Sequence, residues 1–406
     1  MSRMQEMLAR ASSTLIGNYA REPVVFVRGE GSFLWDADGN RYLDLFAGFG
    51  GAILGHAHPA LVAAASQQSQ KLWHVGNVFY NEPQIRFAER MAEVAFTGKA
   101  FFCHSGAEAN EAACKLARLR GNQRTPKRWK IISLERSFHG RTLAMIAATG
   151  NPKVRVGFEP EVPGFVRIPG GDFDALRHAV DDETAGVIME PIQGEGGINL
   201  YPPDYPHQVR QFCDLRGLTL IFDEVWTGCG RTGDWFAHQH FRTPDGRPVT
   251  PDIMTLGKAV GGGLPVGVMW ARPELADLLV PGTHGSTLGG NAICMAVARE
   301  IFDVIEGEKL LDHARRLGQR AVERFTGDAR LASKIAAVRG RGLMLGIELK
   351  QPPDNLLKRA LQRGIIINLT AQKVIRLAPA INIPVDLWSQ GLDIVAELIA
   401  AQECRR

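Results

Sequence analysis

The residues with the clearest chemical potential are a lysine and an aspartate that each follow a short apolar run. Lys258 lies in the glycine-rich segment TLGKAVGGG (255–263), and Asp223 follows the apolar run 218–222. A lysine amine forms a Schiff base with a cofactor aldehyde, and a buried carboxylate keeps a pyridine nitrogen protonated so that the ring withdraws electrons. Together the two residues predict pyridoxal 5′-phosphate (PLP) as the cofactor. Taken singly, a lysine in a surface glycine loop and an aspartate that caps a loop are the plainer alternatives.

A helix start that suits a phosphate group follows the apolar run 100–103. Ser105 and Glu108 have the spacing of a capping box, and an apolar stripe over 109–117 predicts the helix behind them. Free N–H groups at a helix start bind anions, and Gly106 lets a ligand approach the backbone. We therefore expect Ser105 and Gly106 to belong to a site for the cofactor phosphate. A capped helix without a ligand has the same pattern.

Two arginines and an aromatic ring occupy places that suit a substrate. Phe138 and Arg141 lie in FHGR (138–141), where the ring can stack on a pyridine face and the guanidinium can bind a carboxylate through two parallel hydrogen bonds. Arg376 stands among apolar residues in VIRLAP (374–379), where a charge needs a buried partner or a ligand carboxylate. A structural salt bridge is an equal alternative for each arginine.

Two loops carry further polar groups. Glu190 and Glu195 lie in EPIQGEGG (190–197), after the apolar run 186–189, and either acid can serve a site or cap a turn. The loop HGST (284–287) supplies hydroxyl donors.

Short apolar runs and amphipathic segments alternate from about residue 83 and must position these groups. The alternation predicts an α/β fold in which helices cover both faces of a large, mostly parallel sheet. The strands of this sheet are expected at 100–103, 130–134, 186–189, 218–222, 253–256 and 266–270.

Both chain ends are expected to build a second, smaller α/β domain. Residues 24–45 have the pattern of a small β-meander with an Asp-Gly turn. A long helical stretch is expected from residue 291 to about 325, followed by apolar runs at 338–349, 364–368 and 374–377 and a last helix. We divide the chain into an N-terminal segment of the small domain (1–60), a large PLP-binding domain (61–290) and a C-terminal small domain (291–406).

Composition argues against several other classes of function. The 406 residues are 45% hydrophobic and 22% charged with a net charge of +4, so no nucleic-acid or membrane partner is expected. The six cysteines form no C-x-x-C pair, which predicts a reduced compartment and no metal site. Residues 1–17 lack a signal-peptide core, so the cytoplasm is the expected location, with a short organelle-targeting segment as the alternative.

The order of the motifs resembles that of the class III (ω-amino acid) aminotransferases, which have the PLP-dependent transferase fold type I. The likeness covers nearly the whole chain and rests on GHAHP (55–59), SGAEANEAACKLAR (105–118), FHGRT (138–142), EPIQGEGG (190–197), FDEVWTGCGRTG (222–233), PDIMTLGKAVGGGLP (251–265), HGSTLGGN (284–291), RGLMLGIELK (341–350) and VIRLAP (374–379). Within the class, LWHVGNVFYNEPQ (72–84) and the FHGRT and HGST loops most resemble the acetylornithine and succinylornithine aminotransferases.

For the cofactor, the resemblance implies a role for each matching residue. Lys258 forms the Schiff base with PLP, and Asp223 pairs with the pyridine nitrogen. Phe138 stacks on the ring. The backbone N–H groups of Gly106 and Ala107 hold the phosphate.

For the substrates, the resemblance implies a pocket that serves two different molecules. Thr287 reaches the phosphate of the neighbouring subunit, so the active unit is a homodimer with its active site at the subunit interface. Arg141 binds the α-carboxylate of an ornithine-like donor, which places the distal amine at the cofactor. Arg376 binds the α-carboxylate of glutamate or 2-oxoglutarate, while Arg141 takes the far carboxylate. Glu195 pairs with Arg376 when the ω-amino substrate is present, which avoids an unpaired buried cation.

The implied reaction is a ping-pong transfer of the ω-amino group of N-acetylornithine, or a close ornithine derivative, to 2-oxoglutarate, a step of arginine biosynthesis. Lys258 would serve as general base and acid. Three positions depart from the family's pattern: Trp226 replaces a common glutamine, Ala107 a common threonine and Gly51 a branched residue. Ornithine, 4-aminobutyrate and other ω-amines are therefore alternative donors. A PLP racemase or aminomutase and a catalytically silent binding protein of the same fold are the remaining alternatives.

Overall fold

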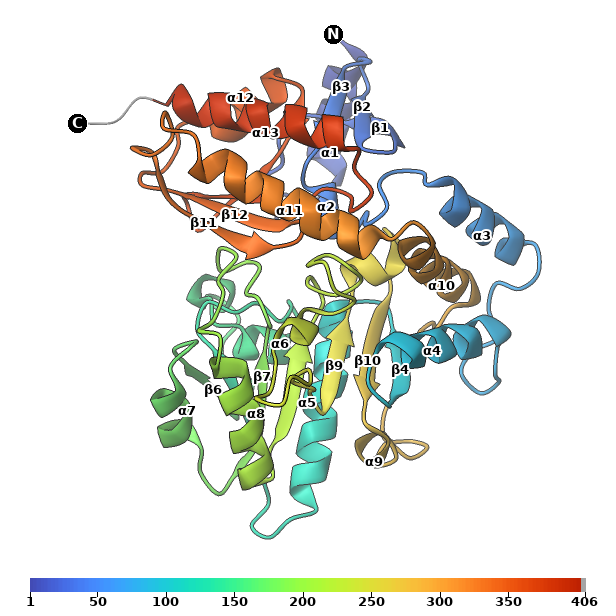
Figure 1. The fold of residues 1–406 in the computed structure, drawn as a ribbon. Helices are drawn as coiled ribbons and strands as arrows, with labels where there is room; N and C mark the ends of the chain where they lie inside the picture. The colour runs from blue at the N-terminus through green and yellow to red at the C-terminus, as the bar shows by residue number, and fades with distance from the viewer. Residues whose placement is uncertain (403–406) are drawn as a thin grey trace.

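The computed structural model describes residues 1–402, and its largest element is a seven-stranded sheet (Figure 1). The strand order is β4-β10-β9-β8-β7-β5-β6, and all neighbours from β9 to β6 pair in parallel. Only β10 runs antiparallel to its neighbours β9 and β4. The strands are β4 (Lys99–Cys103), β5 (Lys130–Leu134), β6 (Phe165–Ile168), β7 (Thr184–Met189), β8 (Thr219–Asp223), β9 (Ile253–Leu256) and β10 (Gly267–Ala271). The predicted α/β fold with a mostly parallel sheet is confirmed.

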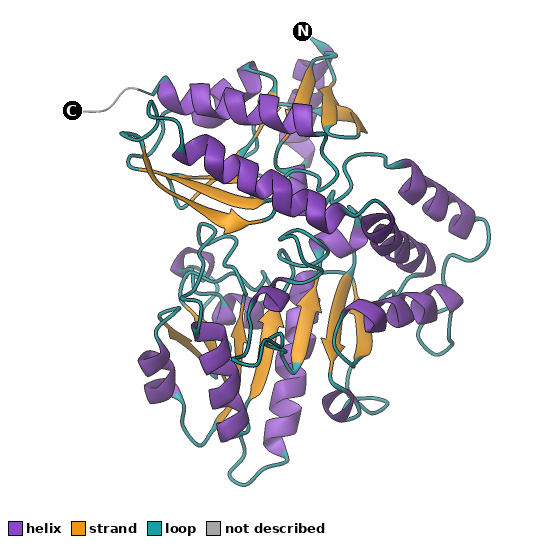
Figure 2. Cartoon of the chain, in the orientation of Figure 1, coloured by secondary structure: helices purple, strands orange, loops and turns teal. Residues whose placement is uncertain are grey.

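Alternating side chains of this sheet enter two separate apolar clusters, so helices cover both faces (Figure 2). Ile131 and Ile221 pack in the cluster beneath one set of helices, whereas their chain neighbours Ile132 and Leu220 pack beneath the other. Because strand side chains alternate with a period of two, the sheet packs against a layer of helices on each of its faces. The first set is α5 (Gly106–Asn122), α6 (Leu143–Ala148) and α9 (Pro273–Ala276), and the second is α7 (Phe173–Ala179) and α8 (Tyr205–Arg216).

The edge strand β6 was not expected from the sequence. It is four residues long, pairs only with β5 and is largely half-buried. It also carries Arg167, whose guanidinium forms an ion pair with Glu161 at 2.9 Å. A short edge strand with an inward charge has no distinct apolar run to reveal it.

Two four-stranded sheets lie beside the large one. In the first, β1 (Phe26–Glu30), β2 (Phe33–Asp36) and β3 (Arg41–Asp44) form the expected meander, and β13 (Ile365–Ile366) pairs in parallel with β3. The second is antiparallel throughout and has the order β11 (Ile335–Arg341), β12 (Met344–Leu349), β15 (Val374–Leu377) and β14 (Asn368–Thr370). Segments from the two chain ends therefore share one sheet. The domain boundaries near residues 60 and 290 stay a prediction.

The helical stretch after residue 291 is two helices, not the single long one that the pattern predicted. The Asn291 side chain caps α10 (Ala292–Gly307) by accepting the N–H of Ile293 at 3.0 Å. Lys309 then adopts a left-handed conformation (φ 55°), which turns the chain into α11 (Leu310–Thr326). A left-handed residue ends one helix and redirects the next without interrupting the apolar periodicity.

The remaining elements complete the layers around these sheets. They are α1 (Arg3–Thr14), α2 (Ala47–Gly50), α3 (Pro59–Ser69), α4 (Glu82–Val94), α12 (Leu356–Gln362) and α13 (Val385–Ala400), with short 3₁₀ turns at Pro152–Val154, Ala237–His240 and Lys258–Gly261.

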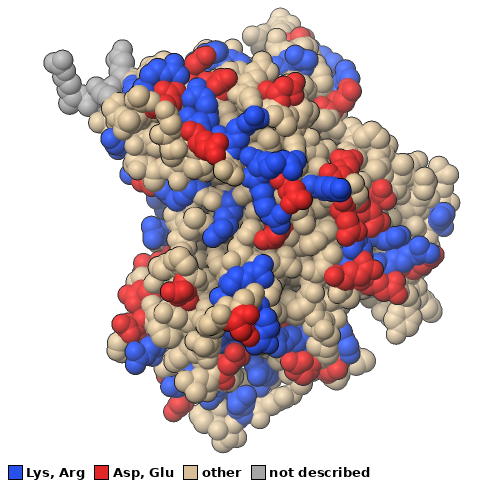
Figure 3. Space-filling view, in the orientation of Figure 1, with Lys and Arg blue, Asp and Glu red and all other residues tan. Residues whose placement is uncertain are grey.

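The surface carries both signs of charge, and the cysteines form no disulfide within residues 1–402. Basic and acidic side chains are interspersed over the face shown in Figure 3. Within residues 1–402, no helix is long and apolar enough to cross a membrane. The five cysteines in that range are free, and Cys404 lies outside the described residues.

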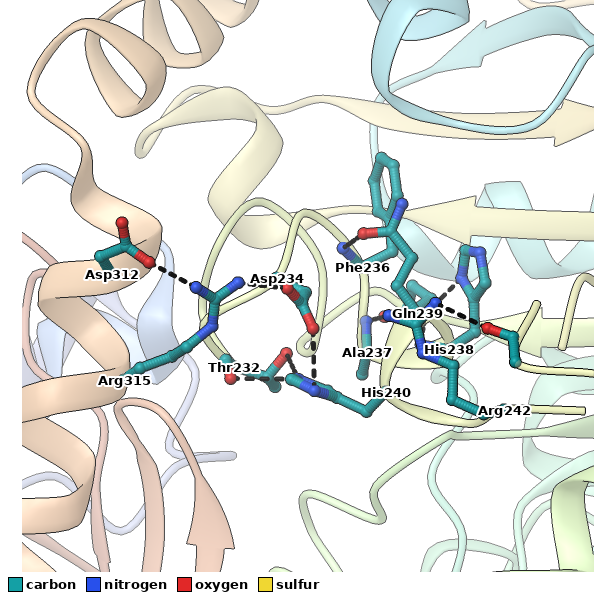
Figure 4. A network of polar contacts seen from close by, with 12 residues as sticks. Thr232, Asp234, Phe236, Ala237, His238, Gln239, His240, Arg242, Asp312 and Arg315 are labelled. Atoms are coloured by element: carbon teal, nitrogen blue, oxygen red, sulfur yellow. Dashed lines mark hydrogen bonds and ion pairs between the residues drawn. The ribbon is translucent and has the colours of Figure 1, made fainter. Parts of the chain in front are cut away.

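A polar network ties the loop after β8 to α11 (Figure 4). Arg315 of α11 forms an ion pair with Asp234, which also pairs with His240 at 2.9 Å. The hydrogen bond from His240 and then that from Arg315 lower the pKa of Asp234 to about 2. The chain that leaves Asp223 is thus anchored to the C-terminal part of the fold.

The contact of α11 with the β11–β12 turn gives a test of the packing. A Cβ at Gly318 would lie 2.1 Å from the carbonyl oxygen of Gly342. We expect Gly318→Ala to lower the free energy of unfolding by about 1–3 kcal/mol, because the methyl group forces the helix off the turn. Gly307→Ala is the matched control, since no heavy atom lies within 4 Å of its Cβ. Equal urea-unfolding midpoints for the two variants would contradict this packing.

Candidate active site

Asp223 is the centre of a buried hydrogen-bond cluster at the carboxyl end of β8. Its Oδ2 accepts hydrogen bonds from Asn110 Nδ2 and His139 Nδ1, each at 2.7 Å, and its Oδ1 accepts the N–H of Val225 at 3.1 Å. Asn110 also accepts the hydroxyl of Thr255 at 2.6 Å. Asp223 is 3% exposed. The cluster fixes the carboxylate plane at the edge of the sheet where α/β folds bind ligands, and Oδ1 keeps a lone pair for another donor.

Lys258 starts a 3₁₀ turn directly after β9. Its backbone is left-handed (φ 45°), a conformation that is strained for a residue other than glycine and that often marks a functional position. Its Nζ lies 5.0 Å from the ring centre of Trp226. Burial lowers the pKa of the amine, while the carboxylates of Asp223 and Glu195 oppose that shift. A lowered pKa increases the fraction of free, nucleophilic amine near neutral pH.

The amino end of α5 lies beside both residues. A Cβ on Gly106 would lie 2.6 Å from the side chain of Val225, which is two residues after Asp223. A Cβ on Gly257, which precedes Lys258, would lie 3.0 Å from the backbone nitrogen of Gly106. Only glycine allows these three segments to approach so closely. The sequence prediction that the helix start, the acid and the lysine meet is consistent with this geometry.

The cap of α5 differs in one bond from the predicted capping box. Ser105 accepts the N–H of Glu108 at 3.2 Å, as expected. The Glu108 carboxylate bonds instead to the N–H of His104 at 2.9 Å, because it reaches one residue beyond the cap. Ala107, the next residue of the helix, lies against the FHGR loop. A Cβ built on Gly140 of that loop would lie 2.6 Å from the Cβ of Ala107.

Phe138 and Arg141 lie on that loop, and a buried glutamate fixes it. The Phe138 N–H donates to Glu190 Oε1 and the Gly194 N–H to Glu190 Oε2, each at 2.9 Å. Burial and then the nearby charge of Asp223 raise the pKa of Glu190 to about 7. Arg141 is exposed, with its guanidinium carbon 5.5 Å from the Phe138 ring centre.

Arg376 and Glu195 form an ion pair of 2.9 Å between Nη1 and Oε1. The Arg376 side chain is 3% exposed and that of Glu195 30%. Asn368 Oδ1 accepts from Nε at 2.8 Å and from Nη2 at 2.6 Å. Burial lowers the pKa of Arg376, and Glu195 opposes the shift. Arg376 therefore forms the salt bridge that the sequence analysis gave as one of its two alternatives.

Thr287 is not brought to these side chains within one subunit. It is exposed and makes no side-chain hydrogen bond in the described part of the chain. Asn77 holds its loop by donating to the carbonyl oxygens of Ser286 at 2.7 Å and Gly289 at 2.9 Å. The adjoining segment exposes four large apolar side chains, Trp73, Val78, Phe79 and Tyr80.

Sequence reasoning did not identify His139 and Asn110 as partners of Asp223. The signal for Asn110 was a polar residue on the buried apolar stripe 109–117, one turn after Gly106. His139 lies beside Phe138 in FHGR, a motif in which the sequence predicts roles for Phe138 and Arg141 only. A buried polar side chain needs a partner, so both were candidates on that ground.

These residues fit PLP. Gly106 begins α5 and offers helix-start N–H groups to an anion, Asp223 Oδ1 can accept from a ring nitrogen, and Lys258 is an amine of lowered pKa. The fold and this group of residues define a PLP-dependent enzyme.

The chain belongs to the class III aminotransferases: that family's sequence profile matches residues 16–399. It is 44% identical to an acetylornithine aminotransferase from Nitrosomonas europaea, over 95% of this chain and 98% of that protein. The structure of an ornithine aminotransferase from Toxoplasma gondii has a TM-score of 0.93 at 32% identity and covers 99% of this chain and 96% of its own. Another structure of that T. gondii enzyme, with a TM-score of 0.92 at 32% identity over 99% of this chain and 95% of its own, holds PLP at partial occupancy in its active site. The cofactor of this family is PLP.

The buried Glu190 predicts a pH-dependent stability. Because its pKa is raised from 4.5 to about 7, the folded protein keeps a proton that the unfolded chain has released, and this contribution to stability falls as pH rises through that window. Glu190→Gln removes the contribution. We expect the stability advantage of the wild type over the variant to be larger at about pH 5.5 than at about pH 8, measured by urea unfolding. A pH-independent difference, like that expected for the exposed Glu89→Gln control, would contradict the assignment.

Proposed function

We propose that this transaminase moves the ω-amino group of N-acetylornithine, or a close ornithine derivative, to 2-oxoglutarate by a ping-pong mechanism. The observation that carries the proposal is the pair of unlike carboxylate receptors, with Arg141 exposed beside Phe138 and Arg376 buried and masked by Glu195. A 44% identical relative that is an acetylornithine aminotransferase supports the choice of donor.

The chemistry at the amine belongs to Lys258 and Asp223. Bound PLP supplies an electrophilic carbon for an amine and a ring that withdraws electrons from the reacting carbon. Asp223 accepts a hydrogen bond from the ring nitrogen and keeps it protonated, while His139 and Asn110 hold the carboxylate in place. Burial lowers the pKa of Lys258, which favours its role as a base: Nζ takes the proton from the reacting substrate carbon and holds it at nitrogen. Phe138 would cover the ring face, and the N–H groups of Gly106 and Ala107, behind Ser105, would bind the phosphate.

The two arginines select the two substrates in turn. Arg141 binds the α-carboxylate of the donor, so that the distal amine of an extended donor would reach the cofactor beside Lys258. During this half-reaction Glu195 neutralises Arg376, which would otherwise be a buried cation without an anionic partner. When 2-oxoglutarate binds, Glu195 leaves, Arg376 takes the α-carboxylate and Arg141 the far carboxylate.

The active unit in this proposal is a homodimer, located in the cytoplasm. Thr287 is exposed and has no side-chain hydrogen bond in residues 1–402, so its hydroxyl is free to reach the phosphate of a second subunit. The exposed apolar side chains of residues 73–80 lie beside its loop and suit burial against another copy.

Ornithine is the second candidate donor, favoured by the close structural match to an ornithine aminotransferase. Gly51 stands where the family resemblance places a branched residue, and a smaller residue there would relax the constraint on donor shape.

Lys258→Ala is expected to abolish turnover by a factor of at least about 10³ and to remove the absorbance band of the lysine-bound cofactor, since no other amine occupies that position. The exposed Lys71→Ala is the control and should keep both signals. Normal turnover in Lys258→Ala would refute the role of the lysine.

A kinetic panel of donors at matched concentration tests the substrate. With 2-oxoglutarate as acceptor, we expect kcat/KM for N-acetylornithine to exceed that for ornithine and 4-aminobutyrate by about tenfold or more, a difference of about 1.4 kcal/mol. Preference for 4-aminobutyrate or ornithine would replace the proposed donor. Turnover without any keto acid acceptor would instead indicate a racemase or aminomutase.

A further inference from the structure

Arg376 is held on its faces as well as on its edges. Its guanidinium carbon lies 4.8 Å from the ring centre of Trp226, 5.5 Å from that of Phe46 and 5.7 Å from that of Phe49. Trp226 is the nearest ring and is 4% exposed. It meets the Phe46 ring edge-on, with 6.2 Å between the centroids. A cation over an aromatic face is attracted most strongly where water is excluded, as it is here.

Of the groups that hold Arg376, Glu195 is the one suited to leave. Its side chain is 30% exposed, and it lies between Gly194 and the pair Gly196 and Gly197, the last with φ +114°. It is also the only ion-pair partner that Arg376 has among residues 1–402. When Glu195 turns away, the guanidinium either follows it or remains in place for an incoming carboxylate. The contacts that do not involve Glu195 decide between these outcomes.

The backbone around Trp226 is shaped to admit an indole ring. A Cβ on Gly50 would lie 2.6 Å from Trp226 Nε1, and a Cβ on Gly194 would lie 2.0 Å from its Cε3. Gly194 also accepts a hydrogen bond from Arg376 Nη1 through its carbonyl oxygen, at 3.3 Å. The indole N–H has no hydrogen-bond partner in the described chain, so the contacts of Trp226 are made by its ring and not by its donor.

We propose that Trp226 is a positioning residue for the acceptor half-reaction: its ring keeps the Arg376 guanidinium in place after Glu195 leaves. The inference rests on the proposed function, in which Arg376 receives the α-carboxylate of the keto acid. The same ring lies 5.0 Å from Lys258 Nζ, so the reacting amine and the carboxylate receptor share one rigid wall. Trp226 therefore sets where the acceptor carboxylate stands relative to the amine. The donor, which binds while Glu195 still holds Arg376, depends on it much less.

Trp226→Leu tests the inference, because leucine fills space but has no aromatic face. We expect the KM for 2-oxoglutarate to rise about tenfold, and the Kd for glutarate, a dicarboxylate that cannot react, to rise by a similar factor in calorimetry of the enzyme loaded with pyridoxamine phosphate, the form that binds the acceptor. The KM for the donor should change by less than about twofold, and Trp226→Phe should keep acceptor affinity within about threefold of the wild type. Trp226→Gln, a second variant without an aromatic face, should behave as the leucine variant does.

Trp235→Leu is the matched control. The Trp235 ring also carries a guanidinium, that of Arg90 at 5.4 Å, and stacks on Phe302 at 5.0 Å. Its loss should lower stability and leave both KM values unchanged.

Two results would overturn the inference: an equal rise of donor and acceptor KM in Trp226→Leu, or a phenylalanine variant as impaired as the leucine variant. Arg376→Ala separates this failure from that of the proposed function. If Arg376→Ala raises the acceptor KM but Trp226→Leu does not, only the role of Trp226 is wrong. If neither variant changes it, Arg376 is not the carboxylate receptor.

Discussion

The carboxylate of Asp223 imposes the constraint on which the rest of the site depends. It is 3% exposed, and its partners in residues 1–402 are three N–H donors, from Asn110, His139 and the backbone of Val225. Burying an ionised carboxylate is costly unless it is hydrogen-bonded and paired with a positive charge. The arrangement leaves Oδ1 able to accept one more donor at the edge of the sheet, a need that a protonated pyridine ring would meet.

The fold brings the other groups to this carboxylate through close backbone contacts. Asp223 ends β8 and Lys258 follows β9, its parallel neighbour, so both stand at the same edge of the sheet. Gly106 and Gly257 then allow the start of α5 to touch both segments. The absence of side chains at these two points is what lets the acid, the lysine and the helix start lie next to one another. The anchoring of the following loop to α11 through Asp234 and Arg315 keeps the C-terminal part, with Arg376, in a fixed relation to it.

The sequence predicted the parts of the site that depend on local pattern. Lys258, Asp223 and the helix start at Ser105 each follow an apolar run, and strand ends in a parallel sheet converge whatever the detailed packing. His139 and Asn110 were missed because their bonds to Asp223 join residues 84 and 113 positions apart, and such a contact depends on how α5 and the FHGR loop pack on the sheet. The break at Lys309 was missed for a related reason, since an apolar stripe continues across a single left-handed residue. The ring contacts of Arg376 with Trp226, Phe46 and Phe49 likewise arise only when three distant segments meet.

Asp223 is expected to keep the ring nitrogen of bound PLP protonated. The ¹⁵N chemical shift of that nitrogen tests this expectation most directly. The wild type loaded with ¹⁵N-labelled PLP is predicted to give the shift of a protonated pyridinium, and Asp223→Asn the shift of a neutral pyridine. A neutral shift in the wild type, or the same shift in both proteins, would contradict the account.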